Sequence, residues 1–368
     1  MPKILQLGSY DKNIGDNIAL FNIRDAMECT RPKDRDVIEW LNLDLSAFHQ
    51  KKNDIEFSIQ VFKELQEKHE PSMLLIGGGG LFEEQLSFES NWKLPFTKDV
   101  LKEIKIPIVV FSVGINYFYN FPELDQKAIQ EMMNLHSASA LFSLRNDGSG
   151  EIFDNMCGLN FEELPDPGLV FARTNNIKEK RDTVFPSRGL YQPAWNNSVV
   201  QKMGRRYTDE NLEFLRKICL NHELEFFCHT LKDYNHVYSR RSPHVIPKKL
   251  FSLVCEFKNI LRATDLYHEY DYSVALRGHG QLIPIGINLP SLYLSTQPKI
   301  IQFALKNGFE DYTVDIREKD WFETLNEKIK LLKNDKNFLN EWYSIRDQVL
   351  PVYKYQMVDF CKKTWELL

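Results

Sequence analysis

Short apolar runs alternate with amphipathic stretches along the first half of the chain. Runs at residues 4–7, 37–41, 73–76, 108–113 and 141–144 have the length of buried strands. Between them, two sets of apolar residues recur at the spacing of one helix face: Ile55, Ile59, Phe62 and Leu65, and then Ile129, Met132, Met133 and Leu135. This alternation predicts a parallel sheet with helices on its faces.

A second series of the same kind follows a polar segment at residues 173–188. Its predicted strands lie at 189–192, 224–228, 272–276, 291–294 and 312–314, and its predicted helices at 209–220, 248–262, 281–287 and 301–307. The sequence therefore predicts an α/β protein with two domains, at 1–175 and 185–335. Helical spacing near the end predicts C-terminal helices at 336–368 that pack back on the N-terminal domain.

Length and composition agree with two hydrophobic cores. Single cores stop growing well before 368 residues, and 43% hydrophobic residues suffice to offset the entropy lost on folding. A net charge of −5 provides no general attraction for nucleic acid, and the basic stretches at 178–181 and 202–206 are short enough to be solvated loops. The six scattered cysteines fit neither a zinc site nor a disulfide scaffold. Because no apolar run reaches membrane-spanning length, we expect a cytoplasmic protein, or one at the inner face of a membrane.

Two glycine-containing turns follow predicted strands of the first domain. After the first strand, Asn13 and Asp16 lie just before a helical pattern. Either Asp16 or Asn17 caps that helix, or Asn13 and Asp16 bind a polar ligand such as a sugar hydroxyl. After the third strand, four glycines at 77–80 allow the backbone N–H groups around Gly78 and Gly79 to approach an anion or a sugar, and a tight turn is the alternative. The run lacks the ending of a P-loop.

Arginine, lysine and histidine side chains follow other predicted strands. Arg145 ends the fifth strand, where it either binds an anion or pairs with Asp147 or Asp166. In the second domain, Arg277 and His279 lie where a strand meets a helix that includes Gln281, and helix N-termini attract anions.

Further along the second domain, Lys299 follows the next strand and His229 follows another. In open α/β sheets, ligands bind at the C-terminal ends of the strands, so these residues are expected to meet in a cleft between the domains. The histidines lack the spacing of a dedicated metal site.

Taken in order, several segments resemble the polysaccharide pyruvyl transferase family. The matching segments are 13–16, 77–80, 111–115, 143–147, 166–167, 277–279 and 298–299. The resemblance implies two Rossmann-like domains with a cleft between them, arranged as in the glycosyltransferase B fold, and phosphoenolpyruvate as donor. It also implies a donor site formed by the catalytic residues Arg145, Arg277, His279 and Lys299. This chain differs from the usual family pattern in having Gly278 between the arginine and the histidine, and in having Asn146 before the aspartate.

These residues suggest a mechanism without a metal or cofactor. Arg277, Arg145 and Lys299 hold the phosphate and carboxylate of phosphoenolpyruvate, and His279 donates a proton to its methylene carbon. Two hydroxyls of one sugar, on a surface polysaccharide or its lipid-linked precursor, then form a cyclic pyruvate ketal, with Asp16 or Glu83 as base. We expect Asn13, Asp16, Gly78, Gly79, His229 and Gln281 to contact substrate.

Two other functions fit the same architecture. One is a glycosyltransferase that uses a nucleotide sugar, since fold does not fix chemistry. The other is a non-catalytic glycan-binding protein.

Overall fold

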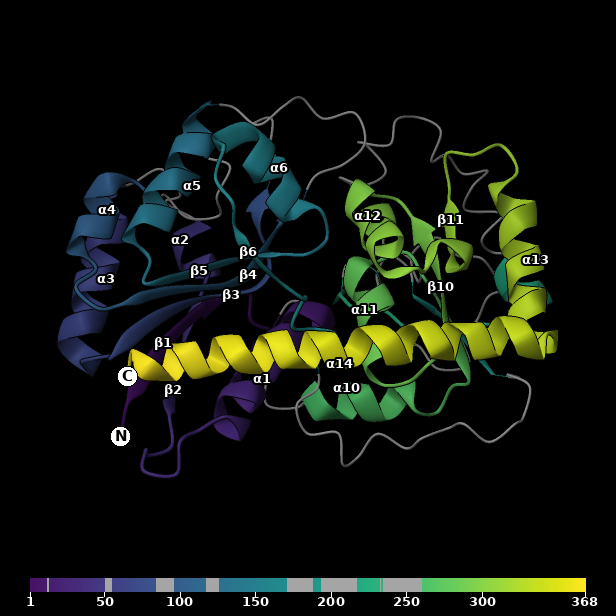
Figure 1. Cartoon of the computed structure of the whole chain (residues 1–368), viewed down its shortest axis with the longest axis horizontal. Coiled ribbons are helices and arrows are strands. Elements are labelled where there is room, and N and C mark those ends of the chain that lie inside the picture. The colour runs from purple at the N-terminus through teal and green to yellow at the C-terminus, as the bar shows by residue number, and fades with distance from the viewer. Residues whose placement is uncertain are drawn as a thin grey trace.

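Two parallel sheets form the framework of the protein (Figure 1). The computed structural model describes residues 1–11, 13–49, 55–83, 96–116, 126–170, 188–192, 217–231, 233 and 260–368. The first sheet has the strand order β2-β1-β3-β4-β5-β6 and the second the order β11-β10-β9-β7-β8. We refer to each sheet with its helices as the N-terminal half and the C-terminal half.

The strands lie close to the predicted positions, except β6, which was not predicted. Those of the N-terminal half are β1 (Lys3–Gly8), β2 (Glu39–Asp44), β3 (Met73–Glu83), β4 (Ile108–Asn116), β5 (Leu141–Arg145) and β6 (Glu162–Leu164). Those of the C-terminal half are β7 (Gly189–Gln192), β8 (Glu225–Phe226), β9 (Tyr272–Ala275), β10 (Ser291–Ser295) and β11 (Thr313–Asp315). In both sheets the strand order reverses direction once, between β1 and β3 and between β7 and β9, which is where doubly wound folds bind ligands.

Helices cover the sheets and connect the strands. In the N-terminal half they are α1 (Ile14–Cys29), α2 (Ser46–His49), α3 (Ile55–His69), α4 (Lys98–Glu103), α5 (Gln126–Ala138) and α6 (Ser149–Cys157). In the C-terminal half they are α10 (Ile260–Tyr267), α11 (Gly278–Gly286), α12 (Pro298–Asn307) and α13 (Trp321–Asn334), with a short 3-10 turn at Glu310–Tyr312. The predicted α/β fold is confirmed. The predicted helices at 209–220 and 248–262, the polar segment at 173–188 and both basic stretches lie partly or wholly outside the described residues.

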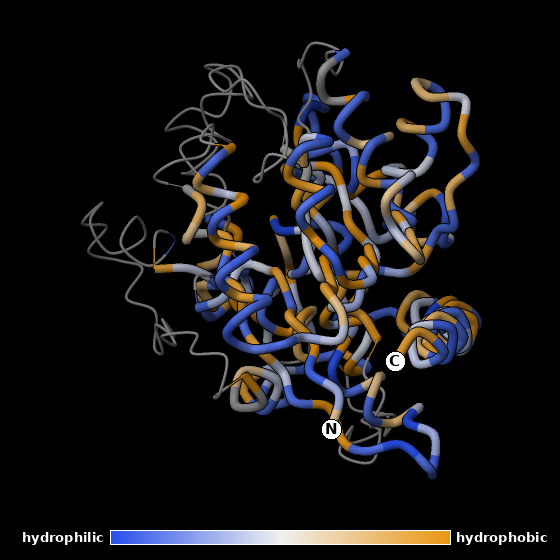
Figure 2. The backbone as a smooth tube through the Cα atoms, turned by 90° about the vertical axis from the view of Figure 1, so that its left-hand side faces the viewer, coloured by the Kyte–Doolittle hydropathy of each residue, from blue (hydrophilic) through white to orange (hydrophobic). Residues whose placement is uncertain are grey.

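The long helix α14 (Lys336–Glu366) runs along both halves (Figure 1). Near its start, the Trp342 ring lies 6.0 Å from Phe309 in the C-terminal half. Near its end, Phe360 packs edge-on against Phe111 at 4.9 Å, and Trp365 Nε1 donates a hydrogen bond to the Met27 carbonyl at 2.8 Å in the N-terminal half. Hydrophobic and hydrophilic positions both occur around its circumference in Figure 2, as expected for a helix with one buried side.

The first turns of α1 join the two halves through an apolar contact. Ile14 and Ile18 are buried with Leu190, Phe227 and Ile283 of the C-terminal half. The Ile14 backbone N–H also donates to the His229 carbonyl at 3.1 Å. Because separating the halves would expose these apolar side chains to water, the contact holds the two sheets together.

Two local predictions were wrong. The strand before the glycine run does not stop at Ile76: β3 continues to Glu83, and Gly77 and Gly79 pair with β4. Glycine is required at this pairing because a Cβ on Gly77 would lie 2.2 Å from the Phe111 carbonyl oxygen. Helix α1 begins before Asp16, at Ile14, and its cap is Asn13, whose Oδ1 accepts from the Gly15 N–H at 3.0 Å.

Candidate active site

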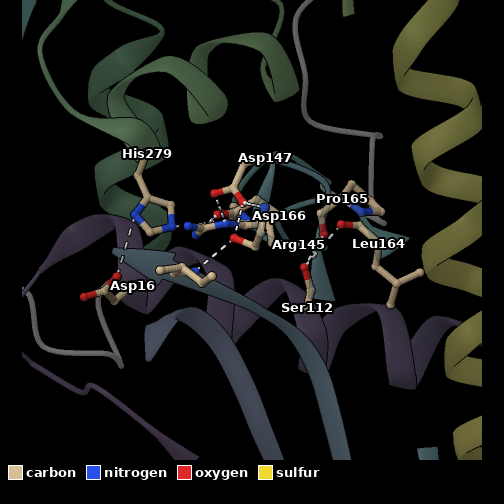
Figure 3. Close-up of polar contacts among 11 residues, drawn as sticks. Asp16, Ser112, Arg145, Asp147, Leu164, Pro165, Asp166 and His279 are labelled. Carbon is tan, nitrogen blue, oxygen red and sulfur yellow. Dashed lines mark hydrogen bonds and ion pairs between the residues drawn. The ribbon is translucent and has the colours of Figure 1, made fainter. Parts of the chain in front are cut away.

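His279 lies between two carboxylates at the junction of the halves (Figure 3). It is in the first turn of α11, directly after β9. Its Nδ1 is 3.7 Å from Asp16 Oδ1, and its Nε2 is 3.4 Å from Asp166 Oδ1. Both aspartates belong to the N-terminal half, so the histidine of one half is placed by acidic groups of the other.

Glycines let His279 approach the N-terminal half this closely. A Cβ on Gly15 would lie 2.3 Å from His279 Cβ, and one on Gly168 would lie 2.8 Å from His279 Cδ2. No larger residue fits at either position unless the backbone or the ring moves. The glycine-containing turn between β1 and α1 therefore packs against His279 through Gly15, whether or not it also contacts a ligand.

Arg145 is buried and paired with two aspartates. Its Nε donates to Asp147 Oδ2 at 2.6 Å and its Nη1 to Asp166 Oδ2 at 2.7 Å. Burial disfavours the charge, but these two carboxylates outweigh burial and raise the pKa of Arg145. Its Nη2 is buried without a hydrogen-bond partner and packs over Gly114, where an added Cβ would lie 2.3 Å away. The ion pairs that the sequence left open as an alternative are both present.

Asp166 is shared between Arg145 and His279. Burial raises the pKa of a carboxyl group, but His279 and Arg145 outweigh burial and hold the pKa of Asp166 well below its usual range. Its Oδ1 also accepts the Gly168 N–H at 2.8 Å. Asp166 is therefore an ionised carboxylate in a buried position.

Lys299 lies in the first turn of α12, next to the start of α11. A Cβ on Gly278 would lie 3.5 Å from Lys299 Cε, so the lysine stem packs over the turn between Arg277 and His279. Burial and the positive charge of Arg145 lower the pKa of Lys299 from 10.5 to about 8, against the opposing effect of nearby aspartates. The lysine is partly accessible, so a ligand can reach it.

Arg277 contacts a different aspartate. Its Nη2 lies 2.6 Å from both Oδ1 and Oδ2 of Asp233, which is fully buried. Asp233 also accepts the Thr230 N–H at 3.1 Å and its hydroxyl at 2.7 Å. The turn after β8 thereby fixes the guanidinium of Arg277 beside the start of α11.

Two residues predicted to contact substrate are buried. His229 Nε2 lies 2.6 Å from the Tyr267 hydroxyl, which donates to Gln192 Oε1 at 2.9 Å. Burial, and then Arg277 and His279, lower the pKa of His229 well below its usual value, so the ring is neutral. Gln281 is buried, with Nε2 lacking a hydrogen-bond partner. Direct contact of either side chain with substrate stays a prediction.

The remaining predicted residues surround Asp16. Asn13 caps α1, which occupies its carboxamide oxygen. Gly78 has a φ of 83° and packs under Leu20 of α1, whereas a Cβ on Gly79 would lie 3.5 Å from Asp16 Oδ1. Of the two glycines, Gly79 is the one placed beside a candidate site residue. The side chain of Glu83, the other proposed base, lies outside the described part of the structure.

Sequence reasoning missed the roles of the aspartates that pair with the basic residues. Asp166 was expected only as a possible partner of Arg145 and not of His279, and Asp233 was not singled out. Ser112 was also missed: it has a φ of 49°, and its hydroxyl donates to the Pro165 carbonyl at 2.7 Å (Figure 3). The available signal was the family-like segments at 111–115 and 166–167, which contain Ser112, Gly114 and Asp166.

Within the described ranges, no group of three or more His, Cys, Asp or Glu side chains is arranged to hold a metal ion. No helix in the part of the chain that the structure describes is both long and apolar enough to cross a membrane.

Comparison with solved structures finds the same fold at low sequence identity. S. aureus MnaA with UDP superposes with a TM-score of 0.59 at 11% identity, over 100% of this chain and 98% of that one. The UDP-GlcNAc 2-epimerase of Neisseria meningitidis, bound to UDP-GlcNAc, has a TM-score of 0.57 at 10% identity, with 99% of both chains covered. At such identities the likeness shows the fold alone.

The family follows from a different comparison. No curated protein matches the chain. The family model for polysaccharide pyruvyl transferase matches residues 13–298, which include both strand-end regions that carry Arg145 and His279. The chain therefore belongs to the polysaccharide pyruvyl transferase family.

Proposed function

We propose that this protein transfers pyruvate from phosphoenolpyruvate to a sugar of a surface polysaccharide or of its lipid-linked precursor, in the cytoplasm or at the inner face of the membrane. The observation that carries the proposal is the position of His279, between Asp16 and Asp166 and beside the starts of α11 and α12. In this position a proton donor, His279, lies next to two cations, Lys299 and Arg277, and to the N-termini of α11 and α12.

The donor is a small molecule with two anionic groups, which two helix starts can bind. Neither α11 nor α12 has a side-chain cap, so their first N–H groups remain available to an anion. Lys299 packs over the start of α11 and Arg277 flanks it. We assign the phosphate to these N–H groups and Lys299, and the carboxylate to Arg277.

Arg145 contributes less charge than the sequence suggested. Asp147 and Asp166 already balance its guanidinium, and only Nη2 lacks a partner. In the proposal, Arg145 supports the site mainly by fixing Asp166. The main donor contacts are then Arg277 and Lys299, and no cofactor is required.

The proposed reaction balances with His279 and Asp16 alone. The first sugar hydroxyl adds to the carbon that bears the phosphate, Asp16 takes its proton, and His279 gives a proton to the methylene carbon, which becomes a methyl group. The 3.7 Å separation of Asp16 and His279 Nδ1 lets the proton on Asp16 return to His279. A second hydroxyl then displaces the phosphate, which leaves with the remaining proton, and the cyclic ketal forms.

The first test separates binding from chemistry. His279→Ala should abolish phosphate release from phosphoenolpyruvate while the variant still binds the donor, as measured by thermal shift. His222→Ala is the matched control, since His222 is a buried histidine that bonds Asn326 at 2.7 Å in the C-terminal half. Near-normal turnover of His279→Ala would remove His279 from the role.

The same thermal-shift assay compares donor classes. The proposal predicts stabilisation by phosphoenolpyruvate and none by UDP, GDP or CMP sugars. Stabilisation by a nucleotide sugar alone would favour a glycosyltransferase. Stabilisation by glycans without phosphate release would indicate a binding protein.

A further inference from the structure

We propose that Asp166 is the positioning residue of His279, which holds the ring through Nε2 and leaves Nδ1 as the nitrogen that exchanges the catalytic proton. The inference deepens the proposed function and rests on it for the chemistry. The contact itself joins Asp166 Oδ1 and His279 Nε2 at 3.4 Å. A carboxylate in this position fixes which nitrogen of a histidine carries the proton.

Asp166 is suited to this role because its other contacts hold it still. Its Oδ2 accepts from Arg145 Nη1 at 2.7 Å, and its Oδ1 accepts the Gly168 N–H at 2.8 Å. The preceding carbonyl, of Pro165, accepts the Ser112 hydroxyl at 2.7 Å. Each oxygen of the carboxylate is oriented, so Oδ1 is directed at the ring (Figure 3).

The two sides of the imidazole ring differ in access to solvent. The side chain of Asp166 is 2% exposed and that of Asp16 is 20% exposed. His279 Nε2 is buried without a well-aligned hydrogen bond, with Asp166 Oδ1 at 3.4 Å as its ion-pair partner, whereas Nδ1 faces Asp16. A substrate can therefore approach Nδ1 from the side of Asp16 and Gly79, while Nε2 stays covered by the N-terminal half.

The pairing of Asp166 with His279 follows from the packing of the two halves. Asp166 and His279 come from different halves, but the buried residues Ile14 and Ile18 of α1 already hold the halves together. Gly15 and Gly168 pack directly against the ring and limit its rotation. The histidine is thus oriented by the folded chain, and no closing motion is needed to orient it.

The protonation states follow from this arrangement. With Nε2–H directed at Asp166, the proton that His279 gives to the methylene carbon leaves from Nδ1, and the lone pair then on Nδ1 accepts the proton from Asp16. Asp166 stabilises the imidazolium present before the first of these steps and formed again by the second. Among the residues that the structure describes, Asp16 of α1 faces the other ring nitrogen, and Arg145 of β5 and Lys299 of α12 interact with Asp166.

The test reads the ring directly in the full-length protein without phosphoenolpyruvate. Nitrogen-15 NMR of histidine-labelled protein, with the His279 signals assigned through His279→Gln, should show the neutral ring protonated on Nε2. Asp166→Asn should change that signal, because an amide cannot hold the N–H in the same way. Asp147→Asn is the control, since it removes a partner of Arg145 and does not contact His279. It should leave the ring signal unchanged.

Kinetics provide the second measurement. Asp166→Asn should lower kcat for phosphate release by at least about 10²-fold, the lower end of what a positioned acid or base contributes, with a smaller change in KM. Protonation of the wild-type ring on Nδ1 would overturn the inference even if the variant failed to fold. So would unchanged kcat in a folded Asp166→Asn protein. An Nε2–H that depends on Asp166, without any turnover of phosphoenolpyruvate, would support the positioning role and refute the proposed function.

Discussion

Replacing Gly15 with alanine tests whether the packing of α1 positions His279. A Cβ at this site would lie 2.3 Å from Cβ, 2.4 Å from Cγ and 2.5 Å from Nδ1 of His279. Carbon atoms in contact rest about 3.5–4.0 Å apart, so Gly15→Ala must displace the ring by about 1 Å. A displacement of that size at a reacting group costs about 10²-fold in rate. Overpacking should also cost about 1–3 kcal/mol of stability.

The assay compares kcat for phosphate release with the melting temperature of each variant. Gly189→Ala is the control, because its Cβ would lie 2.3 Å from Leu224 and 2.4 Å from Tyr272, in the core beneath the second sheet. It should lower Tm as Gly15→Ala does and leave kcat of the folded protein close to wild type. Wild-type kcat in Gly15→Ala, or an equal loss in both variants, would refute the reasoning.

Three further predictions concern Lys299 and α14. Because the pKa of Lys299 is about 8, its charge is lost as pH rises through that value, and the affinity for phosphoenolpyruvate should fall there; Lys299→Arg stays charged and should show no such fall. The unfolded chain holds this proton more tightly, so the free energy of unfolding of unliganded protein should rise between pH 8 and 10.5, and Lys299→Arg should lose that rise in denaturant titrations. A fall in affinity that is equal in both proteins would contradict the assignment. Phe360→Ala should cost about 3–5 kcal/mol in urea denaturation. Tyr355→Ala, at a position that is 72% exposed on the same helix, should cost less than about 0.5 kcal/mol, and equal losses would contradict the packing of α14.

Local apolar patterns were sufficient to predict the two sheets. The run at 108–113 became β4 and that at 291–294 became β10, because buried parallel strands need nearly continuous apolar residues. The glycines at 77–80 were not recognised as strand, since glycine has low strand propensity. Their pairing with β4 depends on the close approach of the Phe111 carbonyl, which comes from another part of the chain.

The candidate site was predicted less completely than the fold. Strand-end positions identified Arg145, Arg277, His279 and Lys299, and the structure places Lys299 beside Gly278 and His279 beside Asp166. The carboxylate partner of each basic residue decides its role in the site, and several of these partners come from distant segments of the chain. No local pattern in the sequence records that Asp166 meets His279, so the orientation of the histidine could not be predicted.

Incubation with phosphoenolpyruvate and a panel of defined glycosides, followed by mass spectrometry and phosphate measurement, tests the central claim most directly. The account predicts a glycoside that gains one pyruvic acid less one water, with one phosphate released for each product. It also predicts that His279→Ala forms neither. Transfer of a hexose from a nucleotide sugar, with no ketal from phosphoenolpyruvate on any glycoside, would contradict it.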